Sequence, residues 1–432
     1  MQTNDWIIIS ILLGCMATYV PIFQCLFFTA VLGFALFTDV PILILIQSLF
    51  RSMDNFSLVV VLFFILCGNI MTAGSIVEKL IKVANALVGW MPGGLGMAGV
   101  LACGMFGAIS GSTVATVVAL GGFMIPALLA NGYPEKYSIG VMVTSPNLGI
   151  IIPPSISMIL YSMISNVSLE GLFLTGFIPG LMIMLATCIY TYFSFVGQKT
   201  KIEPLPFPTL KETLAVMKEG FWSLMLPVII FAGIFSGLFT ANEAAVVACV
   251  YAMIVELFIH RTLGLKDVKR ISVSSAVTSG TLLIIVAGAT CFGRLLTFEE
   301  IPSRITETVL ATISSPAVFL FVANVLLLVV GMFMDVISAT LILGPVFLPM
   351  LDAFHVNWVH FGLLFTVNLA IGYCTPPVGV SLYIGCSIAN RDLIYVVKSV
   401  MPFMLIQLGV LMILTYFPSL VLWLPRFMGF NV

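Results

Sequence analysis

Long apolar runs, separated by short polar connections, follow one another along this chain. Residues 58–66, for example, contain no polar side chain. A helix needs roughly 20 apolar residues to cross the hydrocarbon core of a bilayer. A transmembrane barrel would instead show alternating polarity in segments of about ten residues. The pattern therefore predicts an all-α polytopic membrane protein with about ten to twelve spanning or half-spanning segments.

One unusual pattern occurs twice, once in each half of the chain. In residues 104–154 and again in residues 331–377, an apolar segment interrupted by Gly, Ser or Thr is followed by a second segment that ends in a double proline. A constant offset of 223 residues relates all matched positions from Pro126 and Pro349 onward. Proline interrupts a helix because it lacks the N–H group and clashes with the preceding turn. Broken helices at corresponding positions of two halves are typical of the binding site of a transporter.

The two copies divide the chain into two expected repeats of inverted topology. We place the first repeat at residues 1–196, with its hairpin and broken helix at about 104–165. The second repeat occupies residues 220–432, with its hairpin and broken helix at about 331–387. Residues 197–219 form a linker in which a proline-rich stretch leads into an amphipathic surface helix. An odd number of crossings in the first repeat would insert the second repeat upside down.

Composition and charge narrow the functional classes. Apolar residues make up 61% of the chain and charged residues 8%, whereas a soluble domain carries about a quarter charged residues. The net charge of −1 indicates no nucleic-acid partner. The basic residues gather in residues 199–218 and 261–270, which the positive-inside rule places in the cytoplasm. Nine cysteines without a CxxC pair favour neither a disulfide framework nor a zinc site.

Seven short motifs, in order from residue 57 to the C-terminus, resemble one known family. They are residues 63–68, 108–112, 148–155, 239–245, 295–302, 331–335, and 368–372 followed by 375–379. With these motifs the chain resembles the large membrane subunit (M subunit) of the tripartite ATP-independent periplasmic (TRAP) transporters, including those for sialic acid.

The resemblance implies a sodium-coupled secondary active importer of small organic acids in the bacterial inner (cytoplasmic) membrane, and no enzymatic activity. It implies the elevator-type fold of the ion-transporter superfamily, with two re-entrant helical hairpins. It also implies that sodium ions are transported together with the substrate. Expected partners are a small four-helix membrane subunit encoded separately, a soluble periplasmic substrate-binding protein and membrane lipid. The main substrates of the family are sialic acid and C4-dicarboxylates. A stand-alone sodium/organic-anion symporter, an ion channel and an intramembrane enzyme remain as alternatives.

Sodium is a hard cation, and unwound backbone with hydroxyl and amide side chains offers it oxygen atoms without adding formal charge. In the first half the candidate ligands are Ser110, Ser112 and Thr113, facing Asn147, Gly149 and Pro153. In the second half they are Gly331, Asp335, Ser338 and Thr340, facing Gly372, Thr375 and Pro376. The alternative is that the small residues only allow close helix packing. Asp335 has a second alternative role, as the cap of a half-helix.

An organic acid also needs positive potential in its binding site. Arg294 is an arginine in an otherwise apolar neighbourhood, and its guanidinium can bind a carboxylate through two hydrogen bonds. Because a lone arginine suits a monocarboxylate, sialic acid is slightly favoured over a dicarboxylate. The predicted substrate-binding residues are Arg294, Ser110, Ser338 and Asn147. The alternative for Arg294 is an interfacial side chain that reaches the lipid headgroups. For Glu243 we expect capping of a helix at a turn between two spans.

Overall fold

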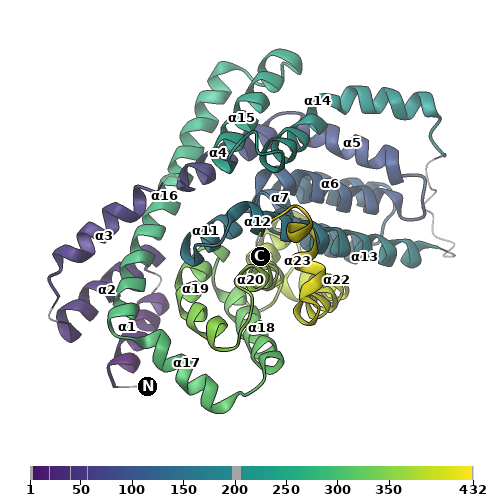
Figure 1. The fold of residues 1–432 in the computed structure, drawn as a ribbon. Helices are drawn as coiled ribbons and strands as arrows, with labels where there is room; N and C mark the ends of the chain where they lie inside the picture. Colours follow the sequence, from purple (N-terminus) through teal and green to yellow (C-terminus); the bar gives the residue numbers. More distant parts are fainter. Residues whose placement is uncertain (1–2, 19, 39, 56, 197–205, 431) are drawn as a thin grey trace.

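The computed structural model describes residues 3–18, 20–38, 40–55, 57–196, 206–430 and 432, and all regular structure in these residues is helical (Figure 1). Nine helices of the described chain are long and apolar enough to cross a membrane. A further candidate span is the pair Leu43–Met53 and Leu58–Ala73, bent by 49°. These features confirm the predicted all-α polytopic class.

An outer group of helices, which we call the frame, comes from two separate parts of the chain. Its longest member, α16, packs against α2, α3 and α4, while α15 packs against α4 and α14 against α5. Figure 1 shows α1–α3 and α16 on the left of the molecule, and α4, α15 and α14 along the top. The frame comprises α1 (Thr3–Ala17), α2 (Ile22–Phe37), α3 (Leu43–Met53), α4 (Ser57–Ala73), α5 (Ile76–Val88), α14 (Leu210–Phe235), α15 (Ala241–Ile254), α16 (Leu265–Phe298) and α17 (Ile301–Thr312).

The remaining helices form an inner block in which the two halves of the chain pack on each other. Helices α9, α10 and α11 of the first half contact α22, α20 and α19 of the second half, respectively. The first-half helices are α6 (Gly94–Ser110), α7 (Thr113–Thr116), α8 (Gly122–Ala130), α9 (Glu135–Thr144), α10 (Leu148–Ile151), α11 (Ile156–Ser165), α12 (Leu169–Thr175) and α13 (Phe177–Phe195). The second-half helices are α18 (Pro316–Phe333), α19 (Val336–Ala353), α20 (Trp358–Gly372), α21 (Val380–Ala389), α22 (Leu393–Tyr416) and α23 (Pro418–Phe427).

Both halves of the inner block contain a hairpin and a broken helix. The first hairpin is formed by α6 and α7–α8 and the second by α18 and α19. The helices that enter them begin at Gly94 and Pro316, ahead of the predicted starts at residues 104 and 331. Gly104 and Gly331 lie inside these helices, where a missing side chain permits close packing against a neighbour. The glycine motif therefore marks a packing face of each hairpin and not its beginning.

The predicted linker is only partly described, because residues 197–205 lie outside the described residues. Helix α14 begins after Thr209, whose side chain and that of Glu212 form a capping box. The helix then continues without a break to Phe235, past the expected boundary at residue 219. The amphipathic segment and the following span are thus one helix.

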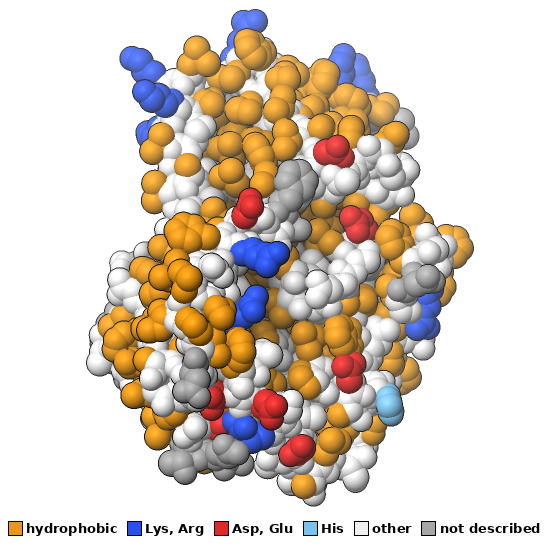
Figure 2. All heavy atoms as spheres, turned by 60° about the vertical axis from the view of Figure 1, so that its left-hand side comes forward, with side chains coloured by type: hydrophobic (Ala, Val, Ile, Leu, Met, Phe, Trp, Pro, Cys, Tyr) orange, Lys and Arg blue, Asp and Glu red, His pale blue; other side chains and the backbone are white. Residues whose placement is uncertain are grey.

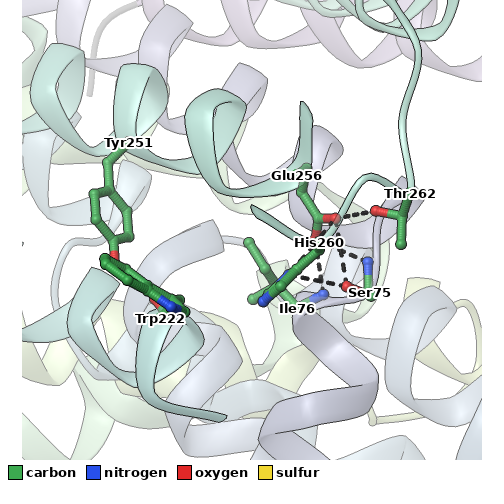
Figure 3. A network of polar contacts seen from close by, with 7 residues as sticks. All are labelled: Ser75, Ile76, Trp222, Tyr251, Glu256, His260 and Thr262. Carbon is green, nitrogen blue, oxygen red and sulfur yellow. Dashed lines mark hydrogen bonds and ion pairs between the residues drawn. The ribbon is translucent and has the colours of Figure 1, made fainter. Parts of the chain in front are cut away.

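A buried carboxylate holds two parts of the frame together (Figure 3). Glu256, in the π-helical turn Val255–Ile259 that continues α15, is 0% exposed. Its Oε1 accepts hydrogen bonds from the backbone N–H groups of Ser75 and Ile76, at 2.8 and 2.9 Å. Its Oε2 accepts from the hydroxyls of Ser75 and Thr262. Because Ser75 and Ile76 stand at the start of α5, the carboxylate both caps that helix and joins it to α15.

Candidate functional site

The first hairpin turns at residues 110–116, which we call the first tip. Gly111, with φ +60°, ends α6 in the left-handed conformation that favours glycine. Ser112 then begins α7, and its Oγ accepts a hydrogen bond from the N–H of Ala115. The Thr116 hydroxyl donates to the Ser112 carbonyl at 2.7 Å and lies 3.3 Å from Ser110 Oγ. The first tip therefore gathers hydroxyl and carbonyl oxygens from both sides of the turn.

The broken helix of the first half approaches this tip at Gly149. A Cβ atom added at Gly149 would lie 2.8 Å from Thr116 Oγ1 and 3.0 Å from the Ser112 carbonyl oxygen. Helix α10 ends two residues later, and Pro153, joined to Pro154 by a cis peptide bond, lies in the non-helical segment that follows. We call residues 145–155 the first break. The structure thus brings Ser110, Ser112 and Gly149 together, with Ser110 and Gly149 buried and Ser112 half-buried.

Thr113 adds a further oxygen at the first tip. Its side chain is 1% exposed, and its Oγ1 has no hydrogen-bond partner among the described residues. A buried hydroxyl without a partner is costly unless another group satisfies it. A cation bound at the first tip would satisfy the Thr113 hydroxyl oxygen.

The second hairpin turns at residues 333–338, the second tip, where Asp335 precedes α19. Its Oδ2 accepts a hydrogen bond from the N–H of Ser338 at 3.0 Å, and its Oδ1 accepts from the Ser338 hydroxyl at 2.6 Å. Asp335 is therefore an N-cap in this conformation, the alternative role considered for it. Its carboxylate nevertheless lies at the turn of the hairpin and is half-buried.

The broken helix of the second half meets the second hairpin at a pair of glycines. A Cβ atom added at Gly372 would lie 2.6 Å from the Cα atom of Gly331. We call residues 372–379 the second break. In this segment, the N–H of Gly379 donates a hydrogen bond to the Met332 carbonyl at 3.0 Å. The Tyr373 hydroxyl accepts from the N–H of Val336 at 2.8 Å. These contacts hold the second break against the second tip.

The two breaks differ in exposure. All residues of the first break are buried, whereas Thr375 and Pro376 are half-buried and Val378 is 37% exposed. The Thr375 hydroxyl donates to the Ile371 carbonyl at 2.8 Å, and the Thr340 hydroxyl donates to the Val336 carbonyl. The second break is therefore the more accessible half of the candidate site.

Asn147 belongs to the first break but faces away from the first tip. Its Nδ2 donates a hydrogen bond at 2.8 Å to Oε1 of Gln407, on α22. Gln407 is not among the residues predicted from the sequence. The signal was present, because Gln407 is an amide in the middle of the apolar run at residues 402–414, and amide side chains inside a span hydrogen-bond to neighbouring helices.

Arg294 lies on the frame, beside a cavity of about 760 Å³. The cavity lies between α16 and the inner block, whose contribution includes Met163 of α11 and Leu341 and Pro345 of α19. Figure 2 shows a hollow in the middle of one face of the molecule, with basic side chains near it and a broad apolar surface above. Arg294 is exposed and lines the cavity.

The other three predicted substrate residues lie elsewhere in the inner block. Ser110, Asn147 and Ser338 are 2%, 0% and 0% exposed. None of the three lines the cavity beside Arg294. Glu243 forms the expected capping box with Thr240 at the start of α15, on the exposed turn between α14 and α15.

A family model and several known relatives match nearly the whole chain. The family model described as "Tripartite ATP-independent periplasmic transporter, DctM component" matches residues 9–420. The chain is 36% identical to the C4-dicarboxylate TRAP transporter large permease protein DctM of Rhodobacter capsulatus, over 98% of this chain and 99% of that relative. It is 33% identical to the sialic acid TRAP transporter large permease protein SiaM of Vibrio cholerae, over 97% and 98%.

A solved structure shares the fold at low sequence identity. The crystal structure of the Alcanivorax borkumensis YdaH transporter matches with a TM-score of 0.61, covering 87% of this chain and 88% of that chain at 16% identity. That crystal structure reveals an unusual topology. This likeness supports the arrangement of helices and carries no information on the substrate.

Proposed function

We propose that this chain, which belongs to the family of TRAP transporter large permeases, is the permease of a sodium-coupled importer of a small organic acid. The observation that carries the proposal is the pairing of each hairpin tip with the break of a second helix. Gly149 approaches the first tip and Gly372 the second hairpin, both within contact distance. Paired helix interruptions of this kind supply carbonyl oxygens and helix ends to ions and anions at membrane depth.

Sodium would be a co-substrate of the transporter, and we propose two sites for it. The first lies between Ser110, Ser112 and Gly149, and the buried Thr113 hydroxyl supports it because this oxygen lacks a partner among the described residues. The second lies between Asp335 and the second break, where Thr375 adds a hydroxyl. Neither site needs a strongly bound metal, because a transported ion must also leave.

The substrate site is proposed at the cavity beside Arg294. Its volume, about 760 Å³, falls in the range of about 300–1,000 Å³ that is usual for small-molecule sites. The guanidinium supplies the positive charge that a carboxylate requires. Relatives named for C4-dicarboxylates and for sialic acid match this chain over nearly its full length. The proposal therefore covers their shared chemistry, a carboxylate-bearing solute.

The same cavity supports an elevator mechanism, because its walls come from two bodies. Arg294 belongs to the frame, while Leu341 and Met163 belong to the inner block. Movement of the inner block along the frame would carry the bound ions and would open the cavity beside Arg294 to one side of the membrane and then to the other. We propose a bacterial inner membrane location, with a small membrane subunit, a periplasmic binding protein and lipid as partners.

Uptake into proteoliposomes tests this function. The vesicles would contain this chain and the small membrane subunit, with the binding protein and a labelled organic acid outside. Uptake should fall to background when external sodium is replaced by potassium or choline. Equal uptake under a proton gradient without sodium would overturn sodium coupling. Uptake that proceeds at the same rate without the binding protein would favour a stand-alone symporter or a channel.

A further inference from the structure

Three side chains from three separate segments meet inside the inner block. Asn147 comes from the first break, Cys374 from the second break, and Gln407 from α22. They are 0%, 1% and 1% exposed. Polar side chains so deeply buried in an apolar block normally satisfy one another's hydrogen bonds.

Gln407 uses both ends of its amide at the start of the first break, where it binds Asn147 and Thr144, the last residue of α9. Its Oε1 accepts from Asn147 Nδ2 at 2.8 Å, and its Nε2 donates to the Thr144 carbonyl at 3.0 Å. The helix tightens after Thr144 into the 3₁₀ turn of residues 145–147. The N–H of Leu148, the regular α-helical partner of the Thr144 carbonyl, turns instead to the carbonyls of Ser145 and Pro146. Gln407 therefore adds a side-chain donor to the carbonyl at which the α-helical hydrogen-bond pattern is interrupted.

Cys374 completes the connection to the second break. Its thiol donates to the Val143 carbonyl at 3.4 Å and lies 3.5 Å from Asn147 Nδ2. The next residue, Thr375, lies 3.5 Å from the sulfur of Met404, three residues before Gln407 on α22. The same turn of α22 thus contacts both breaks.

From this geometry we infer that Gln407 is a positioning residue that couples the two proposed sodium sites. An ion that fixes the backbone of the first break also fixes Asn147, and through Gln407 and Cys374 it orders the second break. The reverse holds equally, because coupling between two binding sites is reciprocal. Since the coupling concerns the proposed sodium sites, it rests on the proposed function. Its consequence is cooperative sodium binding.

The test measures the radioactive sodium bound to the purified full chain, by scintillation proximity, as sodium chloride replaces potassium chloride at constant ionic strength; the melting temperature of each variant without sodium reports its folding. The parent protein should bind sodium with a sigmoidal dependence on concentration. Gln407→Met keeps the length of the side chain and removes both hydrogen bonds. It should make the dependence hyperbolic and raise the midpoint about tenfold, within the usual range of such couplings. Ser399→Ala, on the same helix, removes a hydroxyl that donates to the Tyr395 carbonyl and should leave the curve unchanged.

The outcomes separate this inference from the function on which it rests. If the parent protein binds no sodium, the proposed sodium sites themselves are overturned. If its sodium binding is sigmoidal and stays sigmoidal in Gln407→Met, only the coupling is overturned. A lower melting temperature with the same curve shape would assign Gln407 a purely structural role. Should Gln407→Met fail to fold, Cys374→Ala breaks the second link alone, and an unchanged sigmoidal curve in that variant would overturn the coupling.

Discussion

Asp335 is a cap and a candidate ligand at the same time. Its two carboxylate oxygens accept hydrogen bonds from the backbone and the hydroxyl of Ser338. An asparagine caps a helix about as well as an aspartate, but it lacks the formal charge that attracts a cation. The two roles therefore respond differently to one substitution.

Asp335→Asn should raise the sodium concentration for half-maximal uptake about tenfold, equivalent to about 1.4 kcal/mol. The melting temperature without sodium should change little, because the cap is kept. Asp352→Asn is the matched control near the other end of α19, where the carboxylate accepts a hydrogen bond from Trp358. An unaltered sodium dependence in Asp335→Asn would leave Asp335 with the capping role alone.

Arg294→Lys tests the substrate site by keeping the charge and removing the planar fork of the guanidinium. The apparent KM for the organic acid should rise by about tenfold, with a smaller change in sodium dependence. Arg270→Lys, at an exposed position near the other end of α16, serves as the control. If the KM equals that of the parent, Arg294 does not bind the substrate and is an interfacial anchor. Helix ends and hydroxyl groups would then have to bind the substrate.

At the scale of the elements, the frame depends on a few buried polar links between helices. Glu256 joins α15 to the start of α5 (Figure 3). Beside it, burial lowers the pKa of His260, and the nearby charge of Lys79 acts in the same direction. At the other end of the frame, Arg304 of α17 forms two hydrogen bonds with the buried Asp5 of α1. Such links favour one arrangement of the two helices, because any other arrangement would leave a buried charge without its partner, which is costly.

Glu256→Gln should lower the stability of the protein by about 2 kcal/mol, since hydrogen bonds to a charged group are among the strongest in proteins. Sodium binding should persist, because the link lies within the frame and outside both breaks. Glu243→Gln, in an exposed capping box of the same helix, should leave the melting temperature close to that of the parent. Equal melting temperatures for the two variants would refute the role of Glu256 as a link.

For the whole molecule, the proposed mechanism predicts motion between the frame and the inner block. A pocket of about 210 Å³ between them is lined by Gly280 of α16 and Ile337 of the second tip. Cysteines at these two positions should crosslink to different extents with and without sodium and substrate. A cysteine pair replacing Asn69 and Ser275, which are hydrogen-bonded within the frame at 2.8 Å, should crosslink equally in all conditions. State-independent crosslinking of the first pair would count against an elevator.

The sequence by itself determined the class of the fold and the position of both breaks. Apolar runs specify helices that cross a bilayer, because the backbone must satisfy its own hydrogen bonds there. The double prolines at residues 153–154 and 376–377 end α10 and α20 locally, whatever surrounds them. The family followed from the same short motifs. These features depend on neighbours in the sequence, which a single chain displays directly.

Only the tertiary structure decided which oxygen atoms face one another. Asn147 lies two residues from Gly149, on the opposite side of the helix, so its amide binds Gln407, 260 residues away along the chain. Arg294 faces a cavity whose walls come from α16 on one side and from α11 and α19 on the other. Local sequence cannot specify such partners, because they depend on the rotation of each helix and on contacts between distant segments. The roles of the predicted ligands in sodium and substrate binding stay predictions. The fold itself decides that Ser110 and Ser112 lie at the first tip, that Asp335 and Ser338 lie at the second tip, and that Asn147 binds Gln407.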